Sequence, residues 1–510
     1  MKVDFENWSI NDLVMAAHNN ITELSAGDKS WQDEINKGAE FLQKFWENKG
    51  TVYGVTTGYG DSCTVEIPQK LIEELPTHLT RFHGCGMGDY FDAIETRAIL
   101  ISRLASLKKG HSGVRLELIQ GLINLLNKDI LPLIPKEGSV GASGDLTPLS
   151  YVAATLIGER NVFFKGRICT AGEALEEAGL KPIQLKPKEG LAIMNGTAVM
   201  TALACLAWRR ADYLSKLVSR TTSMLVEAVH GNRDHFCENL FKVKPHAGQN
   251  EVASWIFEDL LDHEMNPDHR LQDRYSIRCA PHVIGVLRDA LPWMKEQIET
   301  ELNSANDNPI IDYKNEEILH GGHFYGGHIA FVMDSMKNAV ANLADLQDRQ
   351  MALLMDKNAN NGLPPNLSGS TGERAPINHG FKAVQIAVSA WTAEALKLTM
   401  PASVFSRSTE CHNQDKVSMG TIAARDCIRV LELCEQVAAA TLLAVTQGIE
   451  IRQNQNELTD SELTSQVKET IKKVREISGF FDEDRPLELE LRETVDFIRK
   501  EHWSLYESEC

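Results

Sequence analysis

The chain has 510 residues, of which 43% are hydrophobic and 24% charged, so it is long enough to bury a large core and is not expected to be disordered. Acidic residues outnumber basic ones by 71 to 52, and the net charge of −19 argues against nucleic acid as a partner. No stretch reaches the roughly 18 uncharged apolar residues that span a bilayer, and the first residues lack the apolar core of a signal peptide. We therefore expect a cytoplasmic protein with no membrane partner.

Apolar residues recur at helical spacing along most of the chain. This periodicity predicts long helices over about 91–128, 197–229, 283–304, 327–357, 379–400 and 417–448. Two stretches look instead like short hairpins, "NVFFKGRIC" (161–169) with Lys165-Gly166 at its turn and "NPIIDYKNEEILHGG" (308–322). The sequence thus predicts a predominantly all-α fold, a long antiparallel helical bundle with a smaller mixed N-terminal domain.

We expect the chain to divide into an N-terminal domain (1–196), a central long-helix bundle (197–450) and a C-terminal helical extension (451–510). The connections between helices are rich in Gly and Asn, as in "YGVTTGYGDS", "HGCGMGDY", "MNGT" and "NSANDNP". Such loops cost backbone entropy and bury little apolar surface. Their number in one helical protein indicates a site assembled from several turns.

Metal, disulfide and nucleotide sites are not expected. The ten cysteines contain no C-x-x-C pair, and several lie on apolar helical faces, as Cys205 does, which favours reduced core thiols. His320, His323 and His328 cluster in "HGGHFYGGH", but no carboxylate or cysteine spacing completes a metal site there. "GCGMG" (84–88) follows no predicted strand and lacks the full G-x-G-x-x-G pattern of a dinucleotide loop.

The stretch "GSVGASGDLTPLS" (138–150) places three small residues just before a helix start, since Thr147 can cap a helix and Pro148 suits its first position. From spacing alone, a tight turn or an anion-binding nest is the preferred interpretation. Chemistry offers an alternative. In a compressed loop the Gly144 amide nitrogen can attack the Ala142 carbonyl carbon, and Ser143 can then lose its hydroxyl as water. The product is a methylidene electrophile beside a positive helix end.

This stretch resembles the signature of the aromatic amino acid ammonia-lyases and aminomutases. Other segments match that family in the same order, namely "YGVTTGYG" (53–60), "GLAIMNGTAVM" (190–200), "YSIRCAPHVIG" (275–285), "NSANDNPIID" (303–312), "HGGHFYG" (320–326) and "NQDKVSMG" (413–420). The resemblance implies a helical homotetramer whose active sites are built by loops from three subunits. It also implies a 4-methylideneimidazole-5-one (MIO) group formed autocatalytically from Ala142, Ser143 and Gly144, with no external cofactor.

The resemblance implies a catalytic role for two tyrosines. Tyr53 corresponds to the base that removes the β-proton of the substrate, and Tyr275 to a second tyrosine near MIO and the substrate amine. An unperturbed tyrosine has a pKa of about 10, so the role of Tyr53 requires a site that favours the phenolate. From the residues alone, a tyrosine before a Gly-rich loop would be assigned to packing.

Substrate-binding roles follow from the same match. Arg278 corresponds to the residue that clamps the substrate carboxylate, for which a planar guanidinium offers two parallel hydrogen bonds. Asn195 corresponds to a residue that hydrogen-bonds near MIO, and Asn308 to one near the substrate carboxylate. Gln414 is expected in this polar network and Phe324 beside the ring. Without the family, the amides would be read as helix caps and Arg278 as part of a surface ion pair.

Phe82-His83 lies where this family contacts the substrate side chain. Histidine lyases carry Ser-His at this place, plant-type phenylalanine lyases Phe-Leu, and many tyrosine lyases His-Leu or Ser-His. Histidine lyases also read "NQED" where this chain reads "NQDK", so the glutamate that would pair with an imidazole is missing. Glu410 matches a glutamate of phenylalanine lyases, whereas His83 can hydrogen-bond a para-hydroxyl. The sequence favours L-tyrosine, with phenylalanine, histidine, an aminomutase outcome and an inactive helical scaffold as alternatives.

Overall fold

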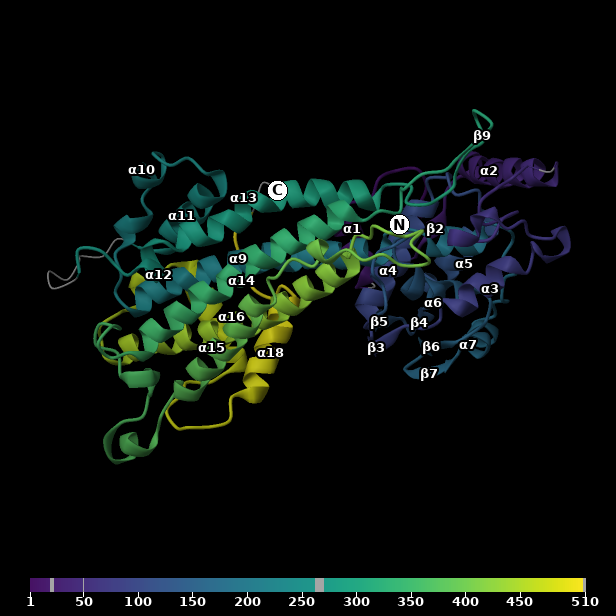
Figure 1. The fold of residues 1–510 in the computed structure, drawn as a ribbon. Helices are drawn as coiled ribbons and strands as arrows, with labels where there is room; N and C mark the ends of the chain where they lie inside the picture. The colour runs from purple at the N-terminus through teal and green to yellow at the C-terminus, as the bar shows by residue number, and fades with distance from the viewer. Residues whose placement is uncertain (19–22, 49, 262–269, 508–510) are drawn as a thin grey trace. The chain divides into compact units, whose positions relative to one another are not determined.

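The computed structural model describes residues 1–18, 23–48, 50–261 and 270–507 (Figure 1). These form two compact units. The first comprises Met1–Arg209, Lys295–Asp334 and Pro401–Arg425, and the second comprises Arg210–Met294, Ser335–Met400 and Asp426–Cys510. The expected continuous segments, 1–196, 197–450 and 451–510, differ from these units because reasoning in chain order cannot detect that two later stretches return to the first unit.

Helices dominate both units, as the sequence predicted. In chain order the α-helices of the described residues are α1 (Ile10–Ala17), α2 (Lys29–Glu47), α3 (Leu75–Phe82), α4 (Ala93–Leu107), α5 (Leu116–Asn127), α6 (Leu146–Leu156), α7 (Ala171–Glu177), α8 (Glu189–Met194), α9 (Ala198–Ala228), α10 (Glu238–Phe241), α11 (Ala247–Asp259), α12 (Tyr275–Arg278), α13 (Ala280–Leu302), α14 (Gly327–Met355), α15 (Lys382–Lys397), α16 (Gly420–Asn454), α17 (Ser465–Ile477) and α18 (Glu488–Arg499).

The strands are short, and they form small separate sheets. They are β1 (Lys2–Val3) with β2 (Ser25–Ala26), β3 (Met87–Tyr90) with β5 (Pro135–Glu137), β4 (Leu131–Pro132) with β6 (Asn161–Phe164) and β7 (Arg167–Thr170), and β8 (Ile310–Asp312) with β9 (Glu317–Leu319). Both predicted hairpins are confirmed. In β6–β7 the two turn residues, Lys165 and Gly166, have φ of 48° and 78°, the conformation that matches the twist of the flanking strands.

Within the second unit, parts of α9, α13, α14 and α16 lie side by side (Figure 1). The Gln350 side chain of α14 donates to Thr222 of α9 at 3.0 Å, and the thiol of Cys434 in α16 donates to the Val340 carbonyl of α14 at 3.5 Å. The buried hydroxyl groups of α9 are satisfied locally, since Thr222 donates to the carbonyl oxygen four residues earlier. Polar residues therefore lie inside the bundle without losing their hydrogen bonds.

The predicted helical run over 91–128 is wrong in one respect, because the structure has two helices there, α4 and α5. Gly110 and Gly113 break the run, and their φ values of 78° and 63° lie in the left-handed region that favours glycine. A Cβ atom on Gly113 would lie 2.8 Å from the Ile311 side chain. The break therefore brings the α4–α5 connection directly against β8.

The described ranges contain neither a helix that could span a membrane nor a cluster of side chains that could bind a metal. No helix there combines the length and apolar character needed to cross a bilayer, and no three His, Cys, Asp or Glu side chains are grouped so that they could hold a metal ion. Nine cysteines in the same ranges are free of disulfides, and Cys510 lies outside the described residues.

Candidate active site

The Ala142-Ser143-Gly144 loop lies just before α6, against the short connection between α8 and α9. Gly144 has a φ of 70° and pairs with Gly196 as an isolated parallel bridge. The Gly196 amide donates to the Ser143 carbonyl at 3.2 Å, and the Asp145 amide donates to the Gly196 carbonyl at 2.8 Å. A Cβ atom on Gly144 would lie only 2.0 Å from the Gly196 carbonyl oxygen. The contact therefore requires a glycine, whose amide no side chain shields.

Asp145 is a buried carboxylate behind this loop that the sequence analysis did not single out. Its Oδ2 accepts from the amides of Val199 and Met200, each at 3.0 Å, and its Oδ1 accepts from the hydroxyls of Ser139, at 3.0 Å, and Thr421. Burial raises the pKa of Asp145, and the four hydrogen bonds oppose that rise. Asp145 stands at the N-cap of α6, but its side chain caps the first turn of α9. In the sequence, the signal for this role of Asp145 was an acidic residue directly after the loop.

Gln414, Asn195 and Asn308 lie around this loop. The Gln414 amide donates to the Ser143 hydroxyl at 3.2 Å. The Asn195 amide donates to the Asn308 carbonyl at 3.0 Å, and Asn308 Oδ1 accepts from the Gly321 amide at 2.8 Å. Asn195 Oδ1 is buried and has no hydrogen-bond partner among the residues described. The network therefore offers a free acceptor close to the loop.

Tyr53 and Glu410 meet at the Gly-rich loop 53–61. The Tyr53 hydroxyl accepts from the Gly60 amide at 2.8 Å, and both Glu410 carboxylate oxygens accept from the Asp61 amide at 3.0 Å. Burial raises the pKa of Tyr53, the Glu410 charge adds to that rise, and the Gly60 amide opposes it. A base would be expected to have a lowered pKa. The pKa of Tyr53 is raised instead, because a half-enclosed phenol near a carboxylate resists losing its proton.

Phe82 and His83 stand at the end of α3, with ring centroids 4.3 Å apart. The His83 Nδ1 lies 3.1 Å from the Leu79 carbonyl oxygen. Since a carbonyl only accepts, Nδ1 carries the proton and Nε2 is left with its lone pair. Burial lowers the pKa of His83, and the nearby Arg160 charge lowers it further. The site therefore holds a neutral imidazole that presents an acceptor.

The remaining predicted site residues are Phe324, Tyr275 and Arg278. Phe324 is half-buried in the connection before α14. Tyr275 and Arg278 belong to the second unit. The Arg278 guanidinium lies 4.6 Å from the Tyr275 ring centroid, and its Nε donates to the Asp273 carbonyl at 3.0 Å. The Tyr275 side chain is 71% exposed, so it is available to a partner surface.

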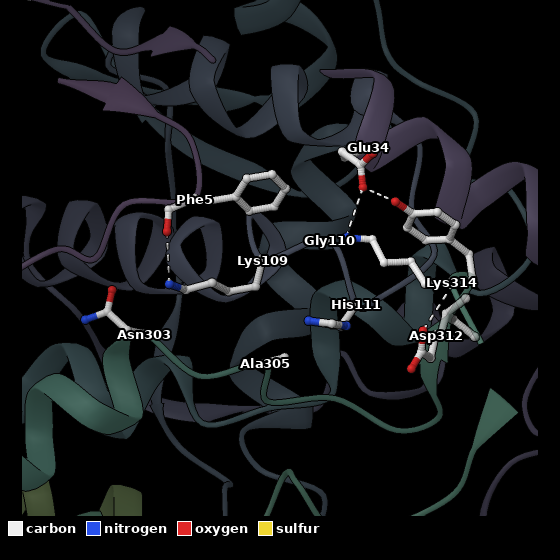
Figure 2. Close-up of a pocket in the computed structure, with 11 residues that line it drawn as sticks. Phe5, Glu34, Lys109, Gly110, His111, Asn303, Ala305, Asp312 and Lys314 are labelled. Atoms are coloured by element: carbon white, nitrogen blue, oxygen red, sulfur yellow. Dashed lines mark hydrogen bonds and ion pairs between the residues drawn. The ribbon is translucent and has the colours of Figure 1, made fainter. Parts of the chain in front are cut away.

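A separate pocket of about 540 Å³ lies in the first unit, beside α2 and β8 (Figure 2). Its charged groups are already engaged, since Glu34 accepts from Tyr313 and pairs with Lys314, and the Lys109 ammonium donates to the Phe5 carbonyl. Asp312 is used in its own turn, where it accepts from the Lys314 amide. None of the predicted site residues lines this pocket.

Residues 8–476 match the family model described as aromatic amino acid lyase. The chain belongs to the aromatic amino acid lyase family. It is 35% identical over 487 residues to a histidine ammonia-lyase of Geobacillus sp. (strain WCH70), covering 95% of this chain and 94% of that protein. The family assignment makes the protein a carbon–nitrogen lyase.

Solved structures of aromatic amino acid lyases and aminomutases have the same fold. A tyrosine aminomutase from Streptomyces globisporus superposes with a TM-score of 0.90 at 32% identity, covering 99% of this chain and 97% of that one. A histidine ammonia-lyase from Trypanosoma cruzi superposes with a TM-score of 0.88 at 30% identity, covering 98% and 93%. The prosthetic group of this family is MIO, which forms autocatalytically from the chain without an external cofactor.

The loop in this aromatic amino acid lyase fits that group. Ring closure needs a bare amide two residues after a carbonyl in a compressed backbone, and Gly144 supplies one that is held within contact distance of Gly196. It also needs a serine hydroxyl that can leave, and Gln414 donates to Ser143 Oγ.

Proposed function

We propose that the protein eliminates ammonia from an aromatic L-amino acid, with L-tyrosine as the preferred substrate and p-coumarate as the product. The observation that carries the proposal is the Gly144–Gly196 contact, which leaves no room for a side chain and lies beside the Gln414–Ser143 hydrogen bond. Ala142, Ser143 and Gly144 are the proposed precursors of the electrophile. MIO supplies an electron-poor carbon that makes the substrate amine a better leaving group.

The residues of this chain supply the rest of the chemistry. Tyr53, as its phenolate, takes the β-proton of the substrate and becomes a neutral phenol, and the Gly60 amide, which donates to the same oxygen, stabilises the phenolate before the transfer. The electrons of the broken C–H bond form the new double bond, and ammonia leaves with the electrons of the C–N bond. Arg278 binds the substrate carboxylate and Tyr275 lies beside the amine, while Asn195, Asn308 and Phe324 orient the substrate.

We infer that the homotetramer is needed for this chemistry, with each site shared between subunits. Support comes from Tyr275, whose side chain is 71% exposed beside Arg278 in the second unit. An aromatic ring left open beside a guanidinium is well suited to close a neighbouring subunit's site.

Tyrosine is favoured by the orientation of His83. With Nδ1–H directed to the Leu79 carbonyl, Nε2 can accept from a phenolic hydroxyl. Phenylalanine would leave that nitrogen unpaired, at a cost of about 1–3 kcal/mol. Phe82 forms an apolar wall that suits any aromatic ring.

Three alternatives have their own support. Glu410 and Phe82 favour phenylalanine. The similar proteins named histidine ammonia-lyase favour histidine, since an imidazole N–H can also donate to His83. The tyrosine aminomutase neighbour favours transfer of the amine to the β-carbon, which depends on how long the product stays in the site.

The test is to incubate the purified protein with L-tyrosine, L-phenylalanine and L-histidine separately. Absorbance of the conjugated acid follows elimination, and mass spectrometry of the products detects any β-amino acid. We expect the largest kcat/KM with tyrosine, and a His83→Leu variant that shifts the preference to phenylalanine. A larger kcat/KM with another substrate would replace tyrosine in the proposal. If the protein turns over none of the three substrates and its intact mass shows that both waters are still present, the inactive helical scaffold is the alternative that remains.

A further inference from the structure

Arg103 lies in α4 with its side chain completely buried, which is unusual for an arginine. Its Nη1 donates to two backbone carbonyls, those of Asn195 at 3.1 Å and Asn306 at 3.2 Å. Its Nε and Nη2 have no hydrogen-bond partner in the part of the chain that the structure describes. A single nitrogen of the guanidinium therefore makes all of its described hydrogen bonds, and both go to loops.

The buried charge is balanced only in part. Asp307 is the carboxylate whose charge acts on Arg103, but the Lys188 ammonium already holds it at 2.6 Å, with both side chains buried. Burial lowers the pKa of Arg103 to about 10, so the guanidinium stays protonated at neutral pH. Two buried cations thus face one carboxylate. Such a cluster is costly to fold, and a hydrophobic residue of similar size would pack at lower cost.

The two carbonyls that Arg103 joins belong to the two loops that carry site residues. One loop contains Asn195 and Gly196, and the other contains Asn306 and Asn308. Gly196 lies between the guanidinium and the reactive loop, since a Cβ atom on it would be 2.2 Å from Arg103 Nη1 and 2.5 Å from the Asn306 carbonyl oxygen. On its other side, Gly196 contacts Gly144. The order in space is therefore Arg103, Gly196, Gly144.

We propose that Arg103 is a positioning residue for ring closure: it fixes the Asn195–Gly196 backbone against Gly144 and keeps the Ala142–Gly144 loop compressed. The proposal rests on the proposed function, because it assumes that this loop forms MIO. Through the carbonyls of Asn195 and Asn306, the same guanidinium joins the two loops that the Asn195–Asn308 hydrogen bond also connects. Arg103 touches neither the reacting atoms nor the substrate, and it exchanges no proton.

Ring closure in this loop balances without a co-reactant. The Gly144 nitrogen bonds to the Ala142 carbonyl carbon, and the carbonyl oxygen leaves as water with the hydrogens of the Gly144 and Ser143 amides. A second water takes the Ser143 hydroxyl and its Cα hydrogen. Because the loop itself supplies every atom, the step depends on how close its backbone is held, and a displacement of about 1 Å can slow such a step by about 10²-fold.

The test compares Arg103→Met and Arg103→Lys with a matched buried arginine of the second unit. Arg452 is 1% exposed, and its guanidinium likewise donates to backbone carbonyls, those of Ala228, Asn360 and Asn361. Arg452→Met therefore reports what losing such a residue does to folding alone. Each full-length protein is expressed in pulses and digested, and the mass of the peptide containing 138–150 is followed with time. The soluble fraction and Tm are measured in parallel.

We expect the wild type to lose two waters, about 36 Da, in this peptide. In the folded fraction of Arg103→Met this loss should be about 10²-fold slower. Arg103→Lys should be slowed about tenfold, because a compact ammonium on a flexible stem does not fix two carbonyls as a planar guanidinium does. Arg452→Met should lower Tm and cyclise at the wild-type rate.

The outcomes separate the two proposals. A wild-type peptide that keeps both waters overturns the proposed function itself. A wild-type peptide that loses them, with folded Arg103→Met or Arg103→Lys cyclising at the same rate, overturns the role of Arg103. If Arg103→Met does not fold, the cyclisation rate of folded Arg103→Lys alone decides whether Arg103 has this role. Equal slowing in Arg452→Met would also overturn the role, because general destabilisation would then explain the effect.

Discussion

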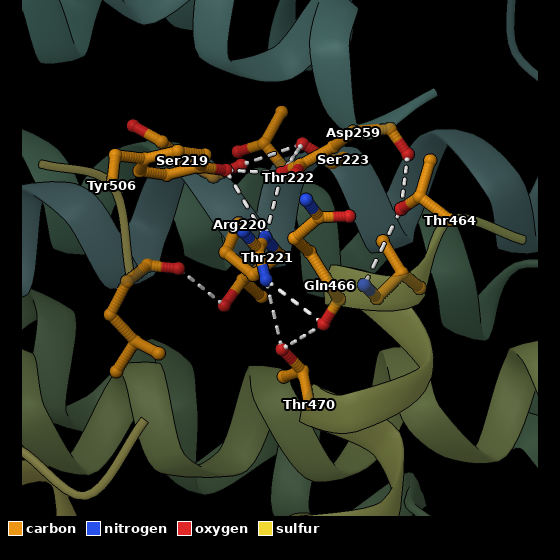
Figure 3. Close-up of polar contacts among 12 residues, drawn as sticks. Ser219, Arg220, Thr221, Thr222, Ser223, Asp259, Thr464, Gln466, Thr470 and Tyr506 are labelled. Atoms are coloured by element: carbon orange, nitrogen blue, oxygen red, sulfur yellow. Dashed lines mark hydrogen bonds and ion pairs between the residues drawn. The ribbon is translucent and has the colours of Figure 1, made fainter. Parts of the chain in front are cut away.

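Asp145 in the first unit and Asp259 in the second are both buried carboxylates whose pKa is raised by burial, yet their neighbours differ in kind. Asp259 accepts from the Arg220 guanidinium at 2.7 Å, from Ser223 at 2.9 Å and from the Tyr506 hydroxyl (Figure 3). The donors to Asp145 are all neutral, two backbone amides and two hydroxyls.

The difference concerns what each carboxylate ties together. In Figure 3, Arg220 also reaches the Thr470 hydroxyl and the Gln466 carbonyl, so the Asp259 cluster joins α9, α11, α17 and the stretch around Tyr506. Asp145 joins the reactive loop to the first turn of α9, whose amides carry partial positive charge. Loss of the Asp259 network should therefore affect stability alone. Loss of the Asp145 network should affect ring closure as well.

The largest effect should come from Asp145→Ala. The change leaves the Val199 and Met200 amides and two hydroxyls without their acceptor, at a cost of about 4 kcal/mol in the free energy of unfolding. Because the loop also loses its anchor, ring closure should slow by about 10²-fold. Peptide mass and urea denaturation measure the two effects. Asp145→Asn keeps one acceptor oxygen, so its stability and its rate of ring closure should lie between those of the wild type and Asp145→Ala. Ring closure at the wild-type rate in folded Asp145→Ala would contradict the difference between the two networks.

Asp259→Ala should cost about 3 kcal/mol, because it leaves Arg220 buried without its carboxylate. The peptide containing 138–150 should nevertheless lose both waters at the wild-type rate in the folded protein. Urea denaturation gives the first quantity and peptide mass the second. Slow cyclisation at unchanged solubility would show that the Asp259 network also acts on the loop.

Tyr506→Phe should remove about 1 kcal/mol, since it deletes one hydroxyl from Asp259 while the Arg220 and Ser223 contacts stay. The stacked contact between the ring and Trp255, with centroids 4.6 Å apart, is kept by phenylalanine. Tm is the measurement, and Trp255→Phe serves as a control for packing. A loss as large as that of Asp259→Ala would mean that the hydroxyl, and not the ion pair, holds the cluster together.

The smallest effect concerns a third carboxylate, Glu410, which lies on the reactive side. Since burial and the Glu410 charge raise the pKa of Tyr53, and only the phenolate can act as a base, kcat/KM should rise with pH between about 7 and 9. Glu410→Gln removes the negative charge, lowers the Tyr53 pKa and should shift this limb to lower pH. Glu410→Asp is the control with the charge kept. If the pH profiles of kcat/KM for the wild type and Glu410→Gln superimpose after scaling, Glu410 does not act on the pKa of Tyr53.

The long helices could be predicted because their apolar residues repeat in the sequence itself. The predicted 417–448 corresponds to α16 and 327–357 to α14, within a few residues. The break between α4 and α5 was not predicted, because the contact that leaves no room for a side chain at Gly113 is made by Ile311 of the distant strand β8. Glycine permits that conformation and does not demand it.

Parts of the candidate site could be predicted from motifs, and parts depend on distant contacts. Gln414 donates to Ser143, while the roles that the family match implies for Gln414 and Asn195 stay predictions. The networks of Asp145 and Arg103 were not predicted, since their partners are separated from them by long stretches of sequence. The sequence indicates Thr147 as the cap of the helix after the loop, whereas the N-cap is Asp145, and it indicates no role for Arg103. The expectation that the site favours the Tyr53 phenolate was wrong, because burial raises the pKa of Tyr53 and the sequence does not show which side chains are buried.

The hydrogen bonds from Gln414 to Ser143 and from Thr421 to Asp145 span 271 and 276 residues of sequence. When the ribosome has just released the loop, neither partner has been synthesised. The electrophile should therefore form late, on a chain that is nearly complete, so that an unfinished or abandoned chain carries no reactive group that could modify its neighbours in the cell.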